Sequence, residues 1–259
     1  MPSECMSTLT RRRAVIASCL AAVGAAGCTG QLPEHVADRS CAGRPPAVYA
    51  ALDVSDSGRS PALVAERLAA VKAVLIDTAV CGGRARVVAF TASAAATDVL
   101  FDRDLTPEGA TRRARLRRVP ELVDGAMGEV RARLQAAADH LPAGGTDVLA
   151  QLGLAREFQS QTGPDRPLRI VVWSDGIATS PVDLNRADLD ATTAGALALP
   201  IDTPRLAGAD VTFAGVGRPA GALPPTRYVD ALKAFYRAAC ERSGATCTVV
   251  SGAGVAQSK

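Results

Sequence analysis

A carboxylate and two hydroxyls alternate in the sequence at Asp53, Ser55 and Ser57. They directly follow an apolar run at residues 47–52, which is typical of a strand buried on both faces. All three side chains offer hard oxygen atoms, the ligands that Mg2+, Mn2+ and Ca2+ prefer. Ligands of open α/β sheets bind outside the carboxyl ends of the strands, so this loop is a candidate metal site.

Two further oxygen side chains occupy comparable places later in the chain. Thr146 follows a glycine turn and precedes an apolar-periodic segment, and Asp175 follows the apolar run at residues 168–173. Each position also has a plain structural interpretation, because Asp, Ser and Thr commonly cap helices and Ser-Asp-Gly commonly forms turns. Their coincidence at one predicted sheet edge favours a shared metal site.

The hydrophobic periodicity predicts strands that alternate with helices along the chain. Strands are expected at 47–52, 84–91, 99–104, 168–173, 209–216 and 247–250, and helices at 61–80, 106–141, 147–161 and 225–240, with one short helix within 177–208. This order predicts an α/β fold of three layers, a doubly wound, mainly parallel sheet with helices on both faces. The domain is expected to span residues 47–252, followed by a tail at 253–259.

With these motifs in this order, the chain resembles a von Willebrand factor A domain with a metal-ion-dependent adhesion site. The resemblance covers roughly residues 47–250. It implies that Ser55 and Ser57 bind the metal directly, that Thr146 binds it directly or through water, and that Asp53 and Asp175 hold metal-bound waters. It further implies Mg2+ as the cofactor, with Mn2+ or Ca2+ as alternatives, and a protein partner whose Asp or Glu completes the coordination.

The amino-terminal segment has the features of an export signal. Arg11, Arg12 and Arg13 precede an apolar stretch that is too short to span a bilayer, and this stretch ends in small residues before Cys28. We interpret residues 1–27 as a signal peptide that resembles a lipoprotein signal, Cys28 as the lipidated residue, and 28–46 as a membrane tether. The arginines also resemble a twin-arginine signal. An ordinary cleaved signal peptide is the alternative.

Four cysteines remain once Cys5, Cys19 and Cys28 are assigned to the signal and the lipid site. An even number in an exported protein favours disulfides. Of the three possible connectivities we expect Cys41–Cys81 and Cys240–Cys247. Cys240 ends a predicted helix and Cys247 starts the next strand, while Cys41 precedes the first predicted strand and Cys81 ends the first helix. Zinc is the competing interpretation, and the absence of a C-x-x-C spacing disfavours it.

Charge and composition argue against nucleic acid as a partner. The whole chain carries +3. The first twenty-seven residues contribute three arginines against Glu4, or +2, which leaves +1 for the rest. Aromatic residues make up only 3%, too few for base-stacking platforms. A basic run, Arg112, Arg113, Arg115, Arg117 and Arg118, is expected to be a solvated helical face.

The leading functional hypothesis is a binding module and not an enzyme: an exported, membrane-tethered domain that recognises a protein through its divalent ion. A metal-assisted hydrolase is the second possibility. It is disfavoured because the sequence lacks a G-x-S-x-G motif and because His140 is expected to lie far from the ligand edge of the sheet. The third possibility is a structural module whose metal motif is vestigial.

Overall fold

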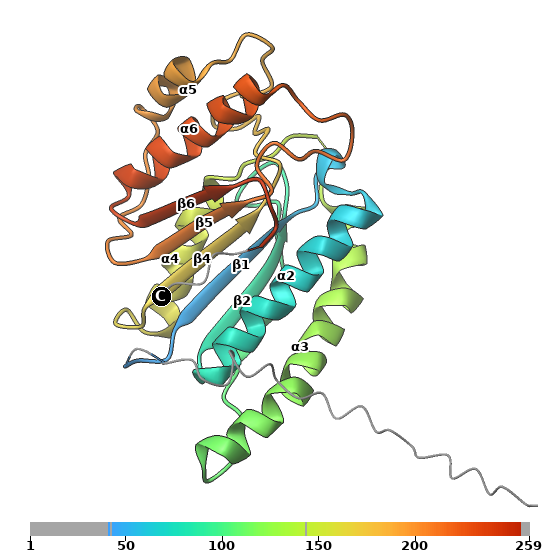
Figure 1. Ribbon diagram of the computed structural model, residues 1–259, viewed down its shortest axis with the longest axis vertical. Coiled ribbons are helices and arrows are strands. Elements are labelled where there is room, and N and C mark those ends of the chain that lie inside the picture. Colours follow the sequence, from blue (N-terminus) through green and yellow to red (C-terminus); the bar gives the residue numbers. More distant parts are fainter. Residues whose placement is uncertain (1–40, 42, 143, 255–259) are drawn as a thin grey trace, which may run out of the picture. The chain divides into compact units, whose positions relative to one another are not determined.

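The computed structural model describes residues 41, 43–142 and 144–254, which form one six-stranded sheet of order β3-β2-β1-β4-β5-β6 (Figure 1). Every neighbouring pair is parallel except β2 and β3. The strands are β1 (Ala47–Asp53), β2 (Arg84–Phe90), β3 (Thr97–Asp104), β4 (Leu168–Trp173), β5 (Asp210–Ala214) and β6 (Thr246–Val250). All six lie where the sequence predicts strands, with ends that differ by at most two residues.

Helices cover both faces of this sheet and enclose two separate cores. The helices are α2 (Pro61–Val80), α3 (Arg112–His140), α4 (Ala150–Thr162), α5 (Ala191–Ala198) and α6 (Thr226–Arg242), with a 3-10 turn η1 (Asp56–Gly58). The first core packs α2 and α3 against one face, and the second packs α4, α5 and α6 against the other. The predicted fold class is therefore confirmed: three layers around a doubly wound, mainly parallel sheet.

Strand β1 is central, and all seven of its residues are buried. Its last residue, Asp53, pairs in register with Phe90 of β2, and Leu52 pairs with Trp173 of β4. Because the three strands are parallel and end at the same level, the segments that follow them leave the sheet at one edge. This edge is the one at which the sequence places the candidate metal ligands.

The start of α3 differs from the prediction. The helix was expected from Thr106 and Pro107 but begins at Arg112, where the hydroxyl of Thr111 accepts a hydrogen bond from Ala114 N. Residues 105–109 have no regular secondary structure, and Leu105 N donates to Gly83 O. The helix therefore begins where the Thr111 side chain can accept a hydrogen bond from a backbone N–H of the first turn.

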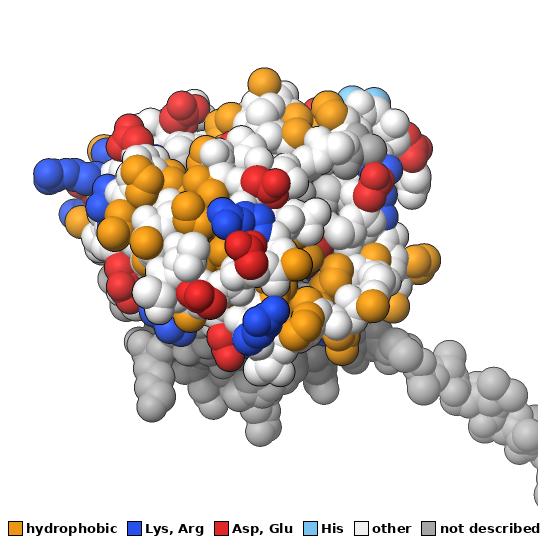
Figure 2. Space-filling model, turned by 90° about the horizontal axis from the view of Figure 1, so that it is seen from above, with side chains coloured by type: hydrophobic (Ala, Val, Ile, Leu, Met, Phe, Trp, Pro, Cys, Tyr) orange, Lys and Arg blue, Asp and Glu red, His pale blue; other side chains and the backbone are white. Residues whose placement is uncertain are grey.

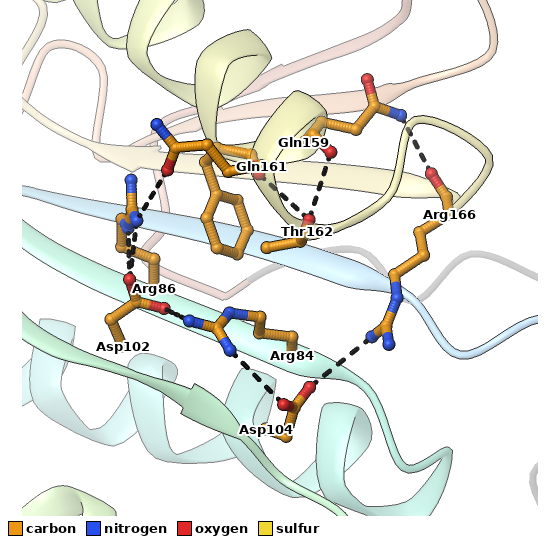
Figure 3. Close-up of polar contacts among 9 residues, drawn as sticks. Arg84, Arg86, Asp102, Asp104, Gln159, Gln161, Thr162 and Arg166 are labelled. Carbon is orange, nitrogen blue, oxygen red and sulfur yellow. Dashed lines mark hydrogen bonds and ion pairs between the residues drawn. The ribbon is translucent and has the colours of Figure 1, made fainter.

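Arginines of β2 and aspartates of β3 form a network of ion pairs beside α4 (Figure 3). Arg86 donates to Asp102 at 2.6 Å and lies 4.7 Å from the ring centroid of Phe158, while Arg84 pairs with Asp102 at 2.8 Å and with Asp104 at 3.4 Å. The arginine side chains cover apolar surface, including the Phe158 ring, and their charges are paired with the aspartates. The network thus completes the cover of the sheet at the outer strand.

Both expected disulfides are present. Cys41 is bonded to Cys81, and Cys240 to Cys247. One joins the segment before β1 to the end of α2, and the other joins α6 to β6, so both lie at the amino ends of strands. Persistent disulfides are typical of oxidising compartments outside the cytoplasm.

Several predictions concern residues outside the described part of the chain. These are the signal peptide at 1–27, the lipid site Cys28, most of the tether at 28–46 and the end of the tail, 255–259. Within the described part, no helix combines the length and the apolar character needed to cross a membrane.

Removing the two disulfides should destabilise the protein unequally. The bonded residues are 40 positions apart for Cys41–Cys81 and 7 apart for Cys240–Cys247. In the chain-entropy model these loops predict losses of about 4 and about 2.5 kcal/mol when both cysteines of a pair become Ala. Urea unfolding of the two double variants measures the difference. An equal or reversed ranking would contradict the prediction, and mass mapping of the untreated protein verifies the pairing.

Candidate metal site

The turn after β1 is built around the buried carboxylate of Asp53, which is 1% exposed. Its Oδ1 accepts a hydrogen bond from Ser55 N at 2.9 Å, and its Oδ2 accepts one from the Ser174 hydroxyl at 2.6 Å. The first bond turns the chain back immediately after the strand, and the second ties β1 to the segment after β4. The hydroxyl oxygens of Ser55 and Ser57 then lie 3.4 Å apart.

Asp175, on the segment after β4, is fully buried. Its Oδ1 accepts a hydrogen bond from Ile177 N at 2.9 Å. Its Oδ2 is buried and has no hydrogen-bond partner among the described residues. Such an oxygen is unusual, because buried polar atoms almost always have a partner. The unpaired oxygen therefore marks a place where a cation or a water molecule would fit.

The pKa of Asp175 reflects the same lack of partners for its buried carboxylate. Burial raises the pKa of its carboxyl group, and the negative charge of Asp53 raises it further. The Ser57 hydroxyl, the backbone N–H of Ile177 and the charge of Arg67 act in the opposite direction. Two carboxylates thus share a buried region in which one arginine is the nearest opposing charge.

Thr146 reaches this edge through a separate set of backbone contacts. Asp147 N donates to Thr91 O at 2.9 Å, which fixes the loop between α3 and α4 at the carboxyl end of β2. Thr146 N donates to the Thr179 hydroxyl at 3.0 Å, and Thr179 N donates to Thr146 O at 3.1 Å. Since Thr179 follows Asp175 by four residues, the Thr146 loop and the Asp175 loop are bonded directly to each other. Thr146 itself is 3% exposed.

Arg67 of α2 binds the turn after β1 through two backbone carbonyls. The sequence did not predict a role for this residue at the site. It is 4% exposed, and its Nη1 donates to Asp53 O at 2.8 Å and to Gly58 O at 3.2 Å. These two carbonyls begin and end the turn, so a single guanidinium group joins both ends. Burial lowers the pKa of Arg67, whereas the nearby Asp53 and Asp175 carboxylates raise it.

The same contact explains why residue 58 is glycine. A Cβ atom at Gly58 would lie 2.7 Å from Asp53 O and 2.9 Å from Arg67 Nη1. Both distances are too short, and the carbonyl belongs to the backbone, so the turn or the arginine would have to move. The glycine therefore permits the close approach on which the turn depends.

The structural alternatives for the site residues can be compared with the contacts. Ser60, and neither Asp53 nor Ser55, caps α2 by accepting from Leu63 N, and the Ser55 side chain caps nothing. Asp147 accepts from Ala150 N at the start of α4, and burial raises the pKa of its carboxyl group. The oxygens of Asp53 and Ser55 are therefore not committed to capping α2.

Three further groups of residues can be placed in the structure. Trp173 is fully buried, and its Nε1 donates to Ala253 O at 2.9 Å. The five arginines of the basic run are exposed along α3, as predicted. His140 ends α3 as predicted, but the expectation that it lies far from the ligand edge is wrong. Its Nε2 is 2.7 Å from Asp98 Oδ2, and Asp98 pairs with Ala89 near the carboxyl end of β2.

The set of oxygens suits a hard divalent cation. The described residues contain no cluster of three or more His, Cys, Asp and Glu side chains, the arrangement that zinc sites use. Serine and threonine hydroxyls with one or two carboxylates and water suit Mg2+, which keeps several waters and seldom has an all-protein cage. Asp53, Ser55, Ser57, Thr146 and Asp175 are the residues that would hold it.

Replacing Arg67 with Met should destabilise the metal-free protein. The buried carbonyls of Asp53 and Gly58 would lose their shared donor, at a cost of about 2–4 kcal/mol for two unsatisfied acceptors. Arg218→Met is the matched control, because this arginine pairs with Glu66 in a partly exposed ion pair of 2.7 Å and should contribute less than about 1 kcal/mol. Urea unfolding in EDTA measures both. Equal losses would mean that Arg67 does not hold the turn.

Comparisons with known proteins give similarity to solved structures only. The sequence matches no family model and no curated protein. The conserved hypothetical protein BatB from Bacteroides thetaiotaomicron is 14% identical, with a TM-score of 0.44 over 80% of this chain and 91% of that chain. Two crystal forms of proximal thread matrix protein 1 from the mussel byssus are each 14% identical, with TM-scores of 0.34 and 0.33 over 73% and 77% of this chain and 40% and 48% of theirs. At these values, the contacts given above remain the basis for what the site can do.

Proposed function

We propose that this domain binds a protein partner through a divalent cation, most plausibly Mg2+, held at the carboxyl edge of the sheet. The cation would be shared by the loops after β1 and β4 and the loop before α4. The observation that supports this most directly is the buried Asp175 Oδ2, which has no partner among the described residues. A bound cation, directly or through its waters, would supply the missing interaction.

The charges of the site support the same proposal. Asp53 and Asp175 contribute two negative charges, and the buried Arg67 contributes one positive charge. The remaining negative charge lies where water is largely excluded, so it favours cation binding more strongly than it would in solvent. The Asp53 oxygens already accept two hydrogen bonds, which suits a role in orienting metal-bound water.

A bound cation would provide an electrophilic centre with room for one more oxygen ligand. The hydroxyls of Ser55 and Ser57 are neutral ligands, so they neutralise little of the metal's charge. An Asp or Glu of a partner could then complete the coordination. This chemistry requires binding and no reaction, and both ring nitrogens of His140 already have partners, Asp98 Oδ2 at 2.7 Å and Ala136 O at 2.6 Å.

The place of action that we propose is the outer side of the cytoplasmic membrane. The two disulfides support export to an oxidising compartment. The tether at 28–46 and a lipid on Cys28 would then hold the domain near the membrane surface. Mass spectrometry of the intact protein from membranes tests the lipid: an unmodified Cys28 would contradict the anchor and leave the metal site untouched.

Replacing Asp175 with Asn should abolish metal binding and leave the metal-free protein at least as stable as the wild type. The amide keeps an acceptor for Ile177 N but removes a buried charge that burial and Asp53 both disfavour. Wild-type protein should melt several degrees higher in millimolar Mg2+ than in EDTA, because a ligand of the folded state stabilises it. The variant should show no such increase, and calorimetric titration should show no binding.

Asp56→Asn is the matched control, because this aspartate belongs to the same turn and is exposed. It should keep both the metal affinity and the Mg2+-dependent increase in melting temperature. The proposal is wrong if the wild type binds neither Mg2+ nor Mn2+, or if Asp175→Asn binds Mg2+ with wild-type affinity.

A further inference from the structure

The loop between β5 and α6, residues 217–225, is attached directly to the candidate metal site. Gly217 N donates to Asp175 O at 2.8 Å, and Ala220 N donates to Ser57 O at 2.7 Å. The loop is therefore fixed to both segments that carry the site's oxygens. Any partner that reaches a metal between Ser57 and Asp175 must also approach this loop.

The exposed part of this loop is apolar. Its sequence is Gly-Arg-Pro-Ala-Gly-Ala-Leu-Pro-Pro, and its one charged residue, Arg218, is paired with Glu66 at 2.7 Å. Leu223 is 75% exposed, more than any other large hydrophobic residue in the described part of the chain. Three prolines restrict the backbone around it, so the loop presents Leu223 with few conformations to lose on binding.

Two other loops that leave the same edge are uncharged in the stretches next to their strands, whereas the turn after β1 carries the exposed Asp56. Residues 91–96 after β2 read Thr-Ala-Ser-Ala-Ala-Ala, and residues 176–182 after β4 read Gly-Ile-Ala-Thr-Ser-Pro-Val. Ala94, Ala95 and Pro181 are exposed. The face seen from above carries charged side chains interspersed with hydrophobic ones (Figure 2). The apolar character is therefore local to the loop at 217–225 and to these two stretches.

We propose that the partner's metal-binding carboxylate lies within an apolar, uncharged segment, and that an aliphatic side chain beside it docks on Leu223. This inference rests on the proposed function, since it assigns the chemistry of the partner at the same site. A single acidic residue would provide the metal-dependent contact, and its aliphatic neighbour would provide the contact that selects the partner. Basic or acidic neighbours would lose their hydration against the loop at 217–225, whose one charged residue, Arg218, is already paired with Glu66.

The test uses the full-length protein and fluorescein-labelled nine-residue peptides with a central Asp. One peptide flanks the Asp with Leu on both sides, a second with Ser, a third with Lys, and a fourth replaces the Asp of the Leu peptide with Asn. In Mg2+ the Leu-flanked Asp peptide should bind about fivefold tighter than the Ser-flanked one, as expected for partial burial of aliphatic side chains. Binding of both should disappear in EDTA, and the Asn peptide should not bind.

Leu223→Ser should reduce the difference between the Leu and Ser peptides to less than about twofold, a loss of most of the burial term, while the affinity for Mg2+ alone stays unchanged. Leu199→Ser is the matched control: Leu199 is 57% exposed and lies just after α5, on the chain that returns to the amino end of β5. This variant should keep the full preference.

The possible outcomes separate the two proposals. If Asp peptides bind only in Mg2+ but the Leu, Ser and Lys versions bind equally, or Leu223→Ser keeps the preference, this inference is overturned and the proposed function stands. If the Asn peptide binds as well as the Asp peptide, the apolar contact is not coupled to a metal-bound carboxylate, and the inference is also overturned. If no Asp peptide shows Mg2+-dependent binding, the proposed function fails along with it.

Discussion

The structure depends on a charge imbalance at the carboxyl edge of the sheet. Asp53 and Asp175 are buried within the same small region, and Arg67 is the buried cation beside them. Burying two like charges is unfavourable, and hydrogen bonds from Ser174, Ser55 N and Ile177 N compensate only in part. Groups that lower stability in this way persist in folded proteins chiefly where they serve a ligand. The buried carboxylates thus connect the fold to its proposed function.

The rest of the fold positions these carboxylates with little freedom. Strand β1 is buried on both faces between two cores, so its last residue cannot slip without displacing apolar side chains on both sides. Arg67 extends from α2, which packs against one face of the sheet, and donates to carbonyl oxygens at both ends of the turn after β1. The Thr146 and Asp175 loops are bonded to each other through Thr179. Three segments far apart in sequence are therefore bonded together at one edge of the sheet.

The sequence predicts the strands and most helices well because burial on both faces leaves uninterrupted apolar runs. It also predicts that Asp53, Thr146 and Asp175 share an edge, because parallel strands end together. It does not predict Arg67, since a charged residue on a helix is normally read as solvated; the available signal was its spacing of four and seven residues before the buried Val71 and Val74. The prediction for the position of His140 was wrong, and the reason is topological. Strand β3 is antiparallel to β2, so its first residues, and Asp98 with them, lie at the edge where β2 ends.

The disulfides lie at the opposite end of the sheet from the site, and this separation has a physical consequence. Cys41–Cys81 and Cys240–Cys247 join segments at the amino ends of strands, where they restrict the unfolded chain without fixing the loops at the carboxyl edge. Stability gained at one end can thus offset the buried charges at the other. The described loops of the site contain no disulfide and are held by hydrogen bonds and apolar packing, which can adjust when a cation and a partner carboxylate enter. A covalent bond among those loops would prevent this movement. A neutral residue in place of Asp175 would remove the negative charge that attracts the cation.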